Sequence, residues 1–528
     1  MCARSPQKSR KQNFGCFVMR NINRNINRNI NRNINRNINR NINRNINRNI
    51  NRNINRNINR VFVRNIKRVI SAITCVFIVA FCASCGSVDS RTKITVWSWE
   101  PSMKRIAADF EKQNPDIRVS VKDTSGYNNL NSAIQDGYGM PDVAQLEYHA
   151  LPQYAVSGQL LDITNRVQGT QTFYTPGTWS SVQLGGRVYG LPMDSGPLAW
   201  FYNQDVFNQA GVDVTQIHTW KDYLHAARKL KNIGVYIAAD SGDASFYNAM
   251  IWLAGGRPFI TSHDGKTVTV RLSKDKGTKD FTKFWQSMID EDLVDTRLAT
   301  WTPAWKSAVG SGSVASVFAG AWMTSLLMHD IPGGAGLWRV ARVPTMNGNN
   351  DNAQMGGSTL SVLQSSRKPE AAMRFVNFVC HDQTGIKERV LSGAFPADVV
   401  TLRDKAFLNK TMVRDSRGID VPYFGGQQFN RIFADAANHV DTGYKYLPFE
   451  VYSRSDFRFT VGLAYDWNRK SRARLTVQSM IDAGIKQDDG KDFQLPDDPG
   501  PKISLKDGIN LWKKDLKEYG YNQGFVVR

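Results

Sequence analysis

The stretch ITVWSWEPSMKRIAADFEKQNPDIRVSV (residues 94–121) places two β-type segments around one amphipathic segment. Residues 94–97 are a short β-branched and aromatic run, and residues 117–121 alternate apolar with polar side chains as a half-buried strand does. Between them, apolar residues in 103–110 recur at helical spacing. The dipeptide Asn114-Pro115 ends this helix. The sequence therefore predicts strand, helix, strand.

Outward from this unit the same alternation continues. A helix is expected around residues 130–134 and a strand at 142–146, so the order is β-α-β-α-β, which predicts a parallel sheet covered on both faces and an α/β fold. Residues 219–222 have the form of a capping box that opens another helix. The C-terminal third is expected to be mostly helical, with an exposed, Asp-rich loop near residues 487–500 whose spacing does not match a calcium site.

The charge of the chain is concentrated at its N-terminus. The chain has 528 residues with 68 Lys and Arg, 46 Asp and Glu, and a net charge of +22. Eighteen of the basic residues lie in 1–68, before the first acid, Asp89, so the remainder is nearly balanced, with 50 basic and 46 acidic residues. A nucleic-acid-binding surface on the main body therefore has no electrostatic basis.

Residues 21–60 are ten copies of Asn-Ile-Asn-Arg. A period of four fits no helix, Asn is poor in strands, and a positive charge every four residues opposes compaction. Residues 1–60 are therefore expected to be a solvated, disordered tract, or not to be translated at all. In the second case synthesis begins near Val61 or Val63 on a non-standard start codon.

Residues 61–84 have the order of an export signal. A basic segment ends at Arg68, and a largely apolar run of thirteen residues, 69–81, follows it, too short for an ordinary spanning helix. The next residues, Cys-Ala-Ser-Cys-Gly, resemble a bacterial lipobox with Cys85 as the lipidated residue. Residues 85–91 would then be a tether, and the rival interpretation is ordinary signal cleavage without a lipid. Either way the body is expected to be exported.

Candidate ligand-binding residues follow three of the predicted strands. Parallel α/β sheets bind ligands beyond the carboxyl ends of their strands. Trp99 and Glu100 follow the first strand, Glu147 and Tyr148 follow the third, and Asp194 follows a later apolar stretch. Carboxylates accept hydrogen bonds from hydroxyl groups, and aromatic rings cover the C–H face of a sugar, so this lining suits a polyol ligand.

Several segments resemble segments of one protein family, and they follow one another in the same order along the chain. They are ITVWSW (94–99), PDVAQLE (141–147), GRVYGLPMDSGPLAWFYNQDVFNQAGV (186–212), FAGAW (318–322), MGGSTLSV (355–362) and KPEAAMRFVNFV (368–379). Together they resemble the family 1 extracellular solute-binding proteins of bacterial ABC importers, the maltose-binding-protein-like group, over nearly all of residues 92–528.

This resemblance implies a periplasmic-binding-protein-like fold with two α/β lobes, a hinge and a cleft between the lobes. Residues 92–197 with 355–405 would form lobe 1, and residues 198–354 with 406–528 would form lobe 2. The chain would cross between them near 194–203, 355–358 and 400–410.

The resemblance also implies which residues line the cleft. In such proteins, the cleft is lined by the residues that correspond to Trp99, Glu147, Asp194 and Trp322. Weaker candidates lie at glycine-containing turns, namely Gly357, Ser358, Gly426 and Gln427.

The implied function is capture of a carbohydrate, most simply an oligosaccharide, and its delivery to a membrane permease. The protein would be a monomer held at the outer face of the cytoplasmic membrane by a lipid on Cys85, with no cofactor, metal or catalytic residue. Two alternatives stay open. One is a secreted glycosidase or lyase that uses Glu100, Glu147 and Asp194. The other is a solute-binding protein for a non-sugar ligand such as a polyamine.

The lipidation site can be tested directly. Metabolic labelling with a fatty-acid analogue should tag the wild-type protein but not Cys85→Ala, because the acyl chains are attached to this thiol. Equal labelling of both proteins would exclude Cys85 as the anchor.

Overall fold

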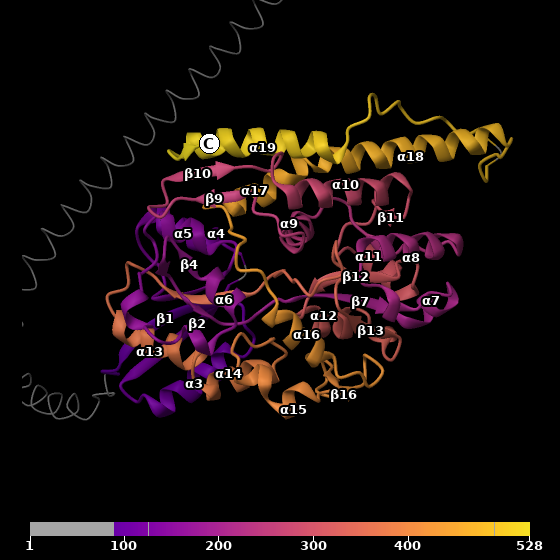
Figure 1. Ribbon diagram of the computed structural model, residues 1–528. Helices are drawn as coiled ribbons and strands as arrows, with labels where there is room; N and C mark the ends of the chain where they lie inside the picture. Colours follow the sequence, from indigo (N-terminus) through magenta and orange to yellow (C-terminus); the bar gives the residue numbers. More distant parts are fainter. Residues whose placement is uncertain (1–88, 125, 490) are drawn as a thin grey trace, which may run out of the picture. The chain divides into compact units, whose positions relative to one another are not determined.

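The computed structural model describes residues 89–528 except residues 125 and 490. The repeat tract, the export signal and Cys85 lie outside the described residues. Arg91–Arg528 form one compact unit. Figure 1 shows this unit with its helices and strands labelled.

The first sheet has five strands in the order β2-β1-β3-β14-β6. Strands β1 (Thr92–Ser98), β2 (Ile117–Asp123) and β3 (Val143–Glu147) are parallel, as the β-α-β-α-β order predicts. Strand β14 (Ser358–Val362) is antiparallel to β3 and to β6 (Leu191–Pro192). The expected parallel sheet is therefore wrong at β14, which runs against both of its neighbours because it enters the sheet from the opposite side after the chain has built the second sheet.

Helices α3 (Met103–Gln113) and α13 (Pro369–Cys380) pack against this sheet and against each other. The ring of Phe110 on α3 lies 5.2 Å from that of Phe375 on α13, edge to face. Helix α3 ends at Asn114, as its proline neighbour predicts. The apolar spacing in 103–110 therefore marks the buried face of this helix.

The second sheet is antiparallel, in the order β12-β7-β13. Strand β7 (Leu198–Asn203) lies in the middle and is buried on both faces, between β12 (Ser316–Gly320) and β13 (Trp338–Ala341). Helix α16 (Phe429–Asn438) packs on β7 and β13. We call the elements around the five-stranded sheet the first lobe and those around this sheet the second lobe.

A helical layer completes the unit. Helix α10 (Lys276–Asp290) packs against α9 (Ala244–Leu253) and α19 (Leu505–Asn522), and α19 lies beside α18 (Gly462–Asp482) (Figure 1). Trp285 and Trp512 are fully buried in this layer. The expected helical C-terminal third is confirmed.

The predicted capping box at residues 219–222 is also confirmed. It opens α8 (Trp220–Asn232), with reciprocal hydrogen bonds between Thr219 and Asp222.

The other helices and strands are short. They are α4 (Asn128–Asp136), α5 (Leu151–Val156), α6 (Pro176–Ser181), α7 (Gln204–Gln209), α11 (Pro303–Ser311), α12 (Met323–Asp330), α14 (Gln383–Leu391), α15 (Lys405–Leu408), α17 (Glu450–Asp456), β4 (Gln183–Leu184), β5 (Arg187–Val188), β8 (Ala238–Ala239), β9 (Phe259–Thr261), β10 (Thr267–Val270), β11 (Val294–Asp295), β15 (Val413–Arg414), β16 (Asp420–Val421) and β17 (Val526–Val527).

Three segments connect the two lobes, and they are hydrogen-bonded to one another. The chain leaves the first sheet after β6 and enters the second at β7, returns between β13 and β14, and leaves again between α14 and α15. The amide of Met355 donates to the carbonyl of Gly196 at 2.8 Å, and that of Ser195 donates to the carbonyl of Phe395 at 3.0 Å. We call residues 193–198, 352–358 and 394–398 the crossing segments.

Close approach of the crossing segments requires a glycine at position 196. A Cβ atom there would lie 2.4 Å from the carbonyl oxygen of Met355. We expect Gly196→Ala to lower the free energy of unfolding by about 1–3 kcal/mol, because two backbones must separate to admit the methyl group. Urea denaturation measures this change.

Gly333→Ala is the matched control. Its added Cβ would have no atom within 4 Å, so its stability should change by no more than about 0.5 kcal/mol. Equal stabilities for the two variants would contradict the tight crossing.

Candidate functional site

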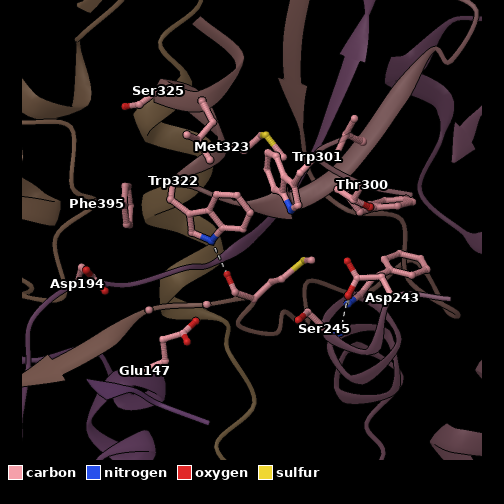
Figure 2. A pocket seen from close by; sticks show the side chains of 18 of the residues that line it. Glu147, Asp194, Asp243, Ser245, Thr300, Trp301, Trp322, Met323, Ser325 and Phe395 are labelled. Atoms are coloured by element: carbon pink, nitrogen blue, oxygen red, sulfur yellow. Dashed lines mark hydrogen bonds between the residues drawn. The ribbon is translucent and has the colours of Figure 1, made fainter. Parts of the chain in front are cut away.

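A cavity of about 530 Å³ lies between the two lobes. The first lobe contributes residues that follow β1 and β3, and the second contributes β12, the start of α12 and the residues before α11. Its volume falls in the range that is usual for small-molecule sites. Figure 2 shows the side chains that face this space.

The structure brings seven of the ten predicted ligand-binding residues together at this cavity. They are Trp99, Glu100, Glu147, Asp194, Trp322, Gly357 and Ser358. The residues that follow strands β1 and β3 meet here because these strands are parallel neighbours, so their carboxyl ends share one edge of the sheet.

Gln145, which was not predicted from the sequence, holds this edge in place. Its side-chain oxygen accepts hydrogen bonds from the Ser98 hydroxyl at 2.6 Å and from the backbone amides of Trp99 and Glu100 at 3.1 and 3.2 Å. Its amide nitrogen donates to the Ser358 hydroxyl at 2.9 Å. One buried side chain thus fixes the residues after β1 relative to the start of β14.

Asp194 connects two crossing segments. Its carboxylate accepts hydrogen bonds from the backbone amide and the hydroxyl of Ser358, at 2.5 and 2.9 Å. Burial raises the pKa of Asp194 to about 6, although the charge of Arg389 and the hydrogen bonds from Ser358 oppose this rise. Asp194 is therefore a structural link as well as a cavity residue.

The other three predicted residues lie outside the cavity lining. Tyr148 is 1% exposed, and its hydroxyl donates to the Asp194 carbonyl at 2.7 Å, so it supports the wall from behind. The amide of Gln427 forms hydrogen bonds with the backbone N–H and carbonyl of Val340 at 2.8 and 2.7 Å, which extends the edge of β13. Gly426 has a φ of +78° in the turn that leads to Gln427. These three residues therefore do not line this cavity, and the turn with Gly426 and Gln427 caps a sheet edge instead.

Two aromatic side chains dominate the second-lobe wall. The indole N–H of Trp322 donates to the Met355 carbonyl at 2.6 Å, and this contact is drawn in Figure 2. Gly320 and Gly356 make room for this ring, because a Cβ at either position would lie within 2.8 Å of its nitrogen. The ring of Trp301 lies 5.8 Å from that of Trp322, at an interplanar angle of 44°.

Trp301 was not identified from the sequence. It is 40% exposed and has a φ of +72°, in the left-handed region that a bulky residue rarely adopts. Thr302 caps α11 immediately after it, with Pro303 at the first helical position. This strained conformation leaves a large apolar ring facing the cavity, and such strain is characteristic of functional sites.

Charged groups line the opposite side of the cavity. Glu147 accepts a hydrogen bond from the Tyr127 hydroxyl at 2.9 Å. Arg454, from α17, lines the same space, donates to the Ser245 hydroxyl at 2.9 Å and pairs with the buried Glu450 at 3.4 Å. Among the described residues, no group of three or more His, Cys, Asp or Glu side chains could hold a metal ion.

The fold and the cavity together define a two-lobed ligand-binding protein. Residues 97–382 match the family described as bacterial extracellular solute-binding protein, and the chain belongs to this family. The sequence prediction of the family and of the two-lobed α/β fold is therefore confirmed.

Two solved structures are similar to this chain along its body. One is the ABC transporter associated binding protein from B. animalis subsp. lactis Bl-04 in complex with β-1,6-galactobiose, which is 44% identical with a TM-score of 0.68, over 83% of this chain and 100% of that one. The galacto-N-biose-/lacto-N-biose I-binding protein from Bifidobacterium longum is 23% identical with a TM-score of 0.64, over 83% of this chain and 99% of that one, and shows the fold alone.

A curated relative belongs to the same class. The lactose-binding protein of Rhizobium radiobacter is 23% identical over 70% of this chain and 87% of its own. These relatives are binding proteins rather than enzymes. The predicted class, the solute-binding component of an ABC importer for carbohydrates, is confirmed at this level. Within the described part of the chain, no helix is long and apolar enough to cross a membrane.

The strain at Trp301 has a measurable consequence. Alanine is normally more stabilising than glycine, but at a positive φ the order reverses by about 1 kcal/mol. We therefore expect Trp301→Gly to be more stable than Trp301→Ala, by denaturant titration of both purified variants. If the alanine variant is the more stable one, Trp301 does not have the left-handed conformation in solution.

Proposed function

We propose that this protein captures a β-linked galactosyl oligosaccharide between its lobes and delivers it to an ABC permease. The observation that carries this proposal is the 44% identity to a protein solved with β-1,6-galactobiose, which the chain matches over the whole of that protein's length. Because the folds superpose along the body, the cavity between the lobes is the natural place for the sugar.

The chemistry of the lining supports a neutral sugar. The indole rings of Trp301 and Trp322 can cover the C–H faces of two pyranose rings, and their angle of 44° suits a bent disaccharide. Glu100 and Glu147 can accept hydroxyl hydrogen bonds, and Arg454 can donate them. Arg454 also argues against a polyamine ligand, because its positive charge would repel a polycation.

We propose that binding closes the lobes about the crossing segments. We keep the lobe bounds that the resemblance implies, residues 92–197 with 355–405 for lobe 1 and residues 198–354 with 406–528 for lobe 2. The third crossing segment, residues 394–398, lies shortly before the last of these bounds. A sugar that touches both lobes binds the closed form more tightly and so shifts the population toward it. The permease then receives the sugar from the closed form, and the protein itself catalyses no reaction.

The proposed role in an ABC importer also suggests how the protein is attached to the cell. We propose that it is a monomer tethered to the outer face of the cytoplasmic membrane through a lipid on Cys85. An anchor of more than one acyl chain holds a protein stably at a bilayer, whereas a single chain holds it weakly. The tether would keep the binding protein close to its permease.

Calorimetric titration tests the ligand. β-1,6-Galactobiose should bind with heat and raise the melting temperature, because a ligand that binds only the native state stabilises it. Maltose and spermidine serve as controls and should bind far more weakly. Trp322→Ala should weaken galactobiose binding by about 30-fold, in line with the loss of a buried aromatic contact.

Two results would overturn parts of this proposal. Tighter binding of spermidine than of any sugar would place the protein among transporters of another solute class. Release of monosaccharide from galactobiose by the purified protein would make it an enzyme.

A further inference from the structure

Arg454 is the one basic residue among the described residues that line the cavity between the lobes. The other charged residues of this lining are acids, namely Glu100, Glu147, Asp194, Asp240 and Asp243. A guanidinium without a counter-charge would attract an anionic ligand into this space. The group that holds and balances Arg454 therefore decides which charge a ligand can carry.

Glu450 provides this balance from behind the cavity wall. It lies one helical turn before Arg454 on α17, it has no exposed surface, and its Oε1 lies 3.4 Å from the Nε of Arg454. The same oxygen accepts a hydrogen bond from the side-chain amide of Asn248 on α9, at 3.0 Å. Because a buried charge is strongly unfavourable without its partner, the two charged residues hold each other in place.

A second contact fixes the direction of the guanidinium. Arg454 donates from a terminal nitrogen to the hydroxyl of Ser245 at 2.9 Å, and Ser245 lies in the first turn of α9 on the cavity wall (Figure 2). A guanidinium carries five N–H donors in one plane. Once its Nε edge and one terminal nitrogen are held, the directions of its other donors are set as well.

Electrostatics keep both groups of this pair charged. Burial lowers the pKa of Arg454, but Glu450, Tyr446 and Glu147 outweigh this effect, so the pKa lies above its usual value. Burial raises the pKa of Glu450, and the charge of Arg454 opposes that rise. Each residue thus stabilises the charged form of the other.

We propose that Glu450 is a positioning residue that sets the charge specificity of the sugar site, so that the site accepts neutral galactosides and rejects sugars that carry a carboxylate. This inference rests on the proposed function and refines it. The guanidinium of Arg454 faces the ligand as a donor to hydroxyl groups and as a barrier to cations. A ligand carboxylate finds no unpaired cation there, and it meets the carboxylates of Glu100 and Glu147.

Calorimetric titration with two disaccharides tests this inference. One is β-1,6-galactobiose, and the other is the same disaccharide with its non-reducing galactose oxidised to galacturonate. The wild-type protein should bind the acidic disaccharide at least about tenfold more weakly, because like charges then face each other. The wild-type comparison alone can overturn the inference, whether or not a variant folds.

Glu450→Gln keeps the shape of the side chain and an acceptor for Asn248 but removes the charge. We expect galactobiose binding to weaken by about fivefold, because Arg454 loses its charged anchor. The preference for galactobiose over the acidic disaccharide should shrink by about tenfold, because Arg454 is then unbalanced. Glu518→Gln, at an exposed position on α19, is the matched control and should keep the wild-type preference.

The double variant Glu450→Gln/Arg454→Gln separates charge balance from a purely structural role of Glu450. It removes the unbalanced cation, so the preference for galactobiose should return although the affinity stays low. A mere loss of structure at position 450 would not be reversed in this way.

The outcomes distinguish this inference from the proposed function. Tighter binding of the acidic disaccharide by the wild-type protein, an unchanged preference in Glu450→Gln, or a preference that the double variant does not restore would overturn the role of Glu450 and leave the galactoside function intact. Failure of the wild-type protein to bind either disaccharide would overturn the proposed function and this inference with it.

Discussion

The hydrogen bonds among the crossing segments are the constraint on which the cavity depends. Asp194 accepts two hydrogen bonds from Ser358, and Met355 donates its amide to Gly196 and accepts the indole N–H of Trp322. The contacts of Asp194 with Ser358 and of Met355 with Gly196 join residues that are more than 150 positions apart in the sequence, and Trp322 lies 33 positions from Met355. They place the carboxyl ends of β1 and β3 opposite the start of α12, so a ligand between them touches both lobes.

Glycines and backbone strain shape the aromatic wall. Gly320 and Gly356 leave room for the indole of Trp322, which would otherwise collide with a Cβ at either position. Trp301 keeps a positive φ although its side chain is bulky. Such a conformation costs on the order of 1–3 kcal/mol, which the surrounding packing must offset. The body of the protein therefore holds this aromatic wall in shape.

The strand-end rule predicted the first-lobe wall because it depends only on local pattern and on parallel pairing. Trp99, Glu100 and Glu147 follow short β segments that any alternation analysis finds. The sequence could not predict Gln145 or Trp301, since a glutamine inside an apolar strand and a tryptophan before a helix have no distinctive signature. Gln427 lies away from the cavity, because its turn resembles a ligand loop but pairs with β13.

The direction of β14 could not be predicted from the sequence either. A parallel sheet is the simplest continuation of β-α-β-α-β, and nothing in residues 355–362 shows that the chain returns from a second sheet. The family resemblance supplied what periodicity could not, namely the two lobes and the cleft between them. It did so because the order of several weak segments is more specific than any one of them.

A crystal structure of the protein with β-1,6-galactobiose tests the central claim most directly, namely that the sugar lies between the lobes at the crossing segments. The account predicts galactosyl rings on the indoles of Trp301 and Trp322, with hydroxyl groups hydrogen-bonded to Glu100 or Glu147. A sugar bound to one lobe alone, away from these residues, would contradict it.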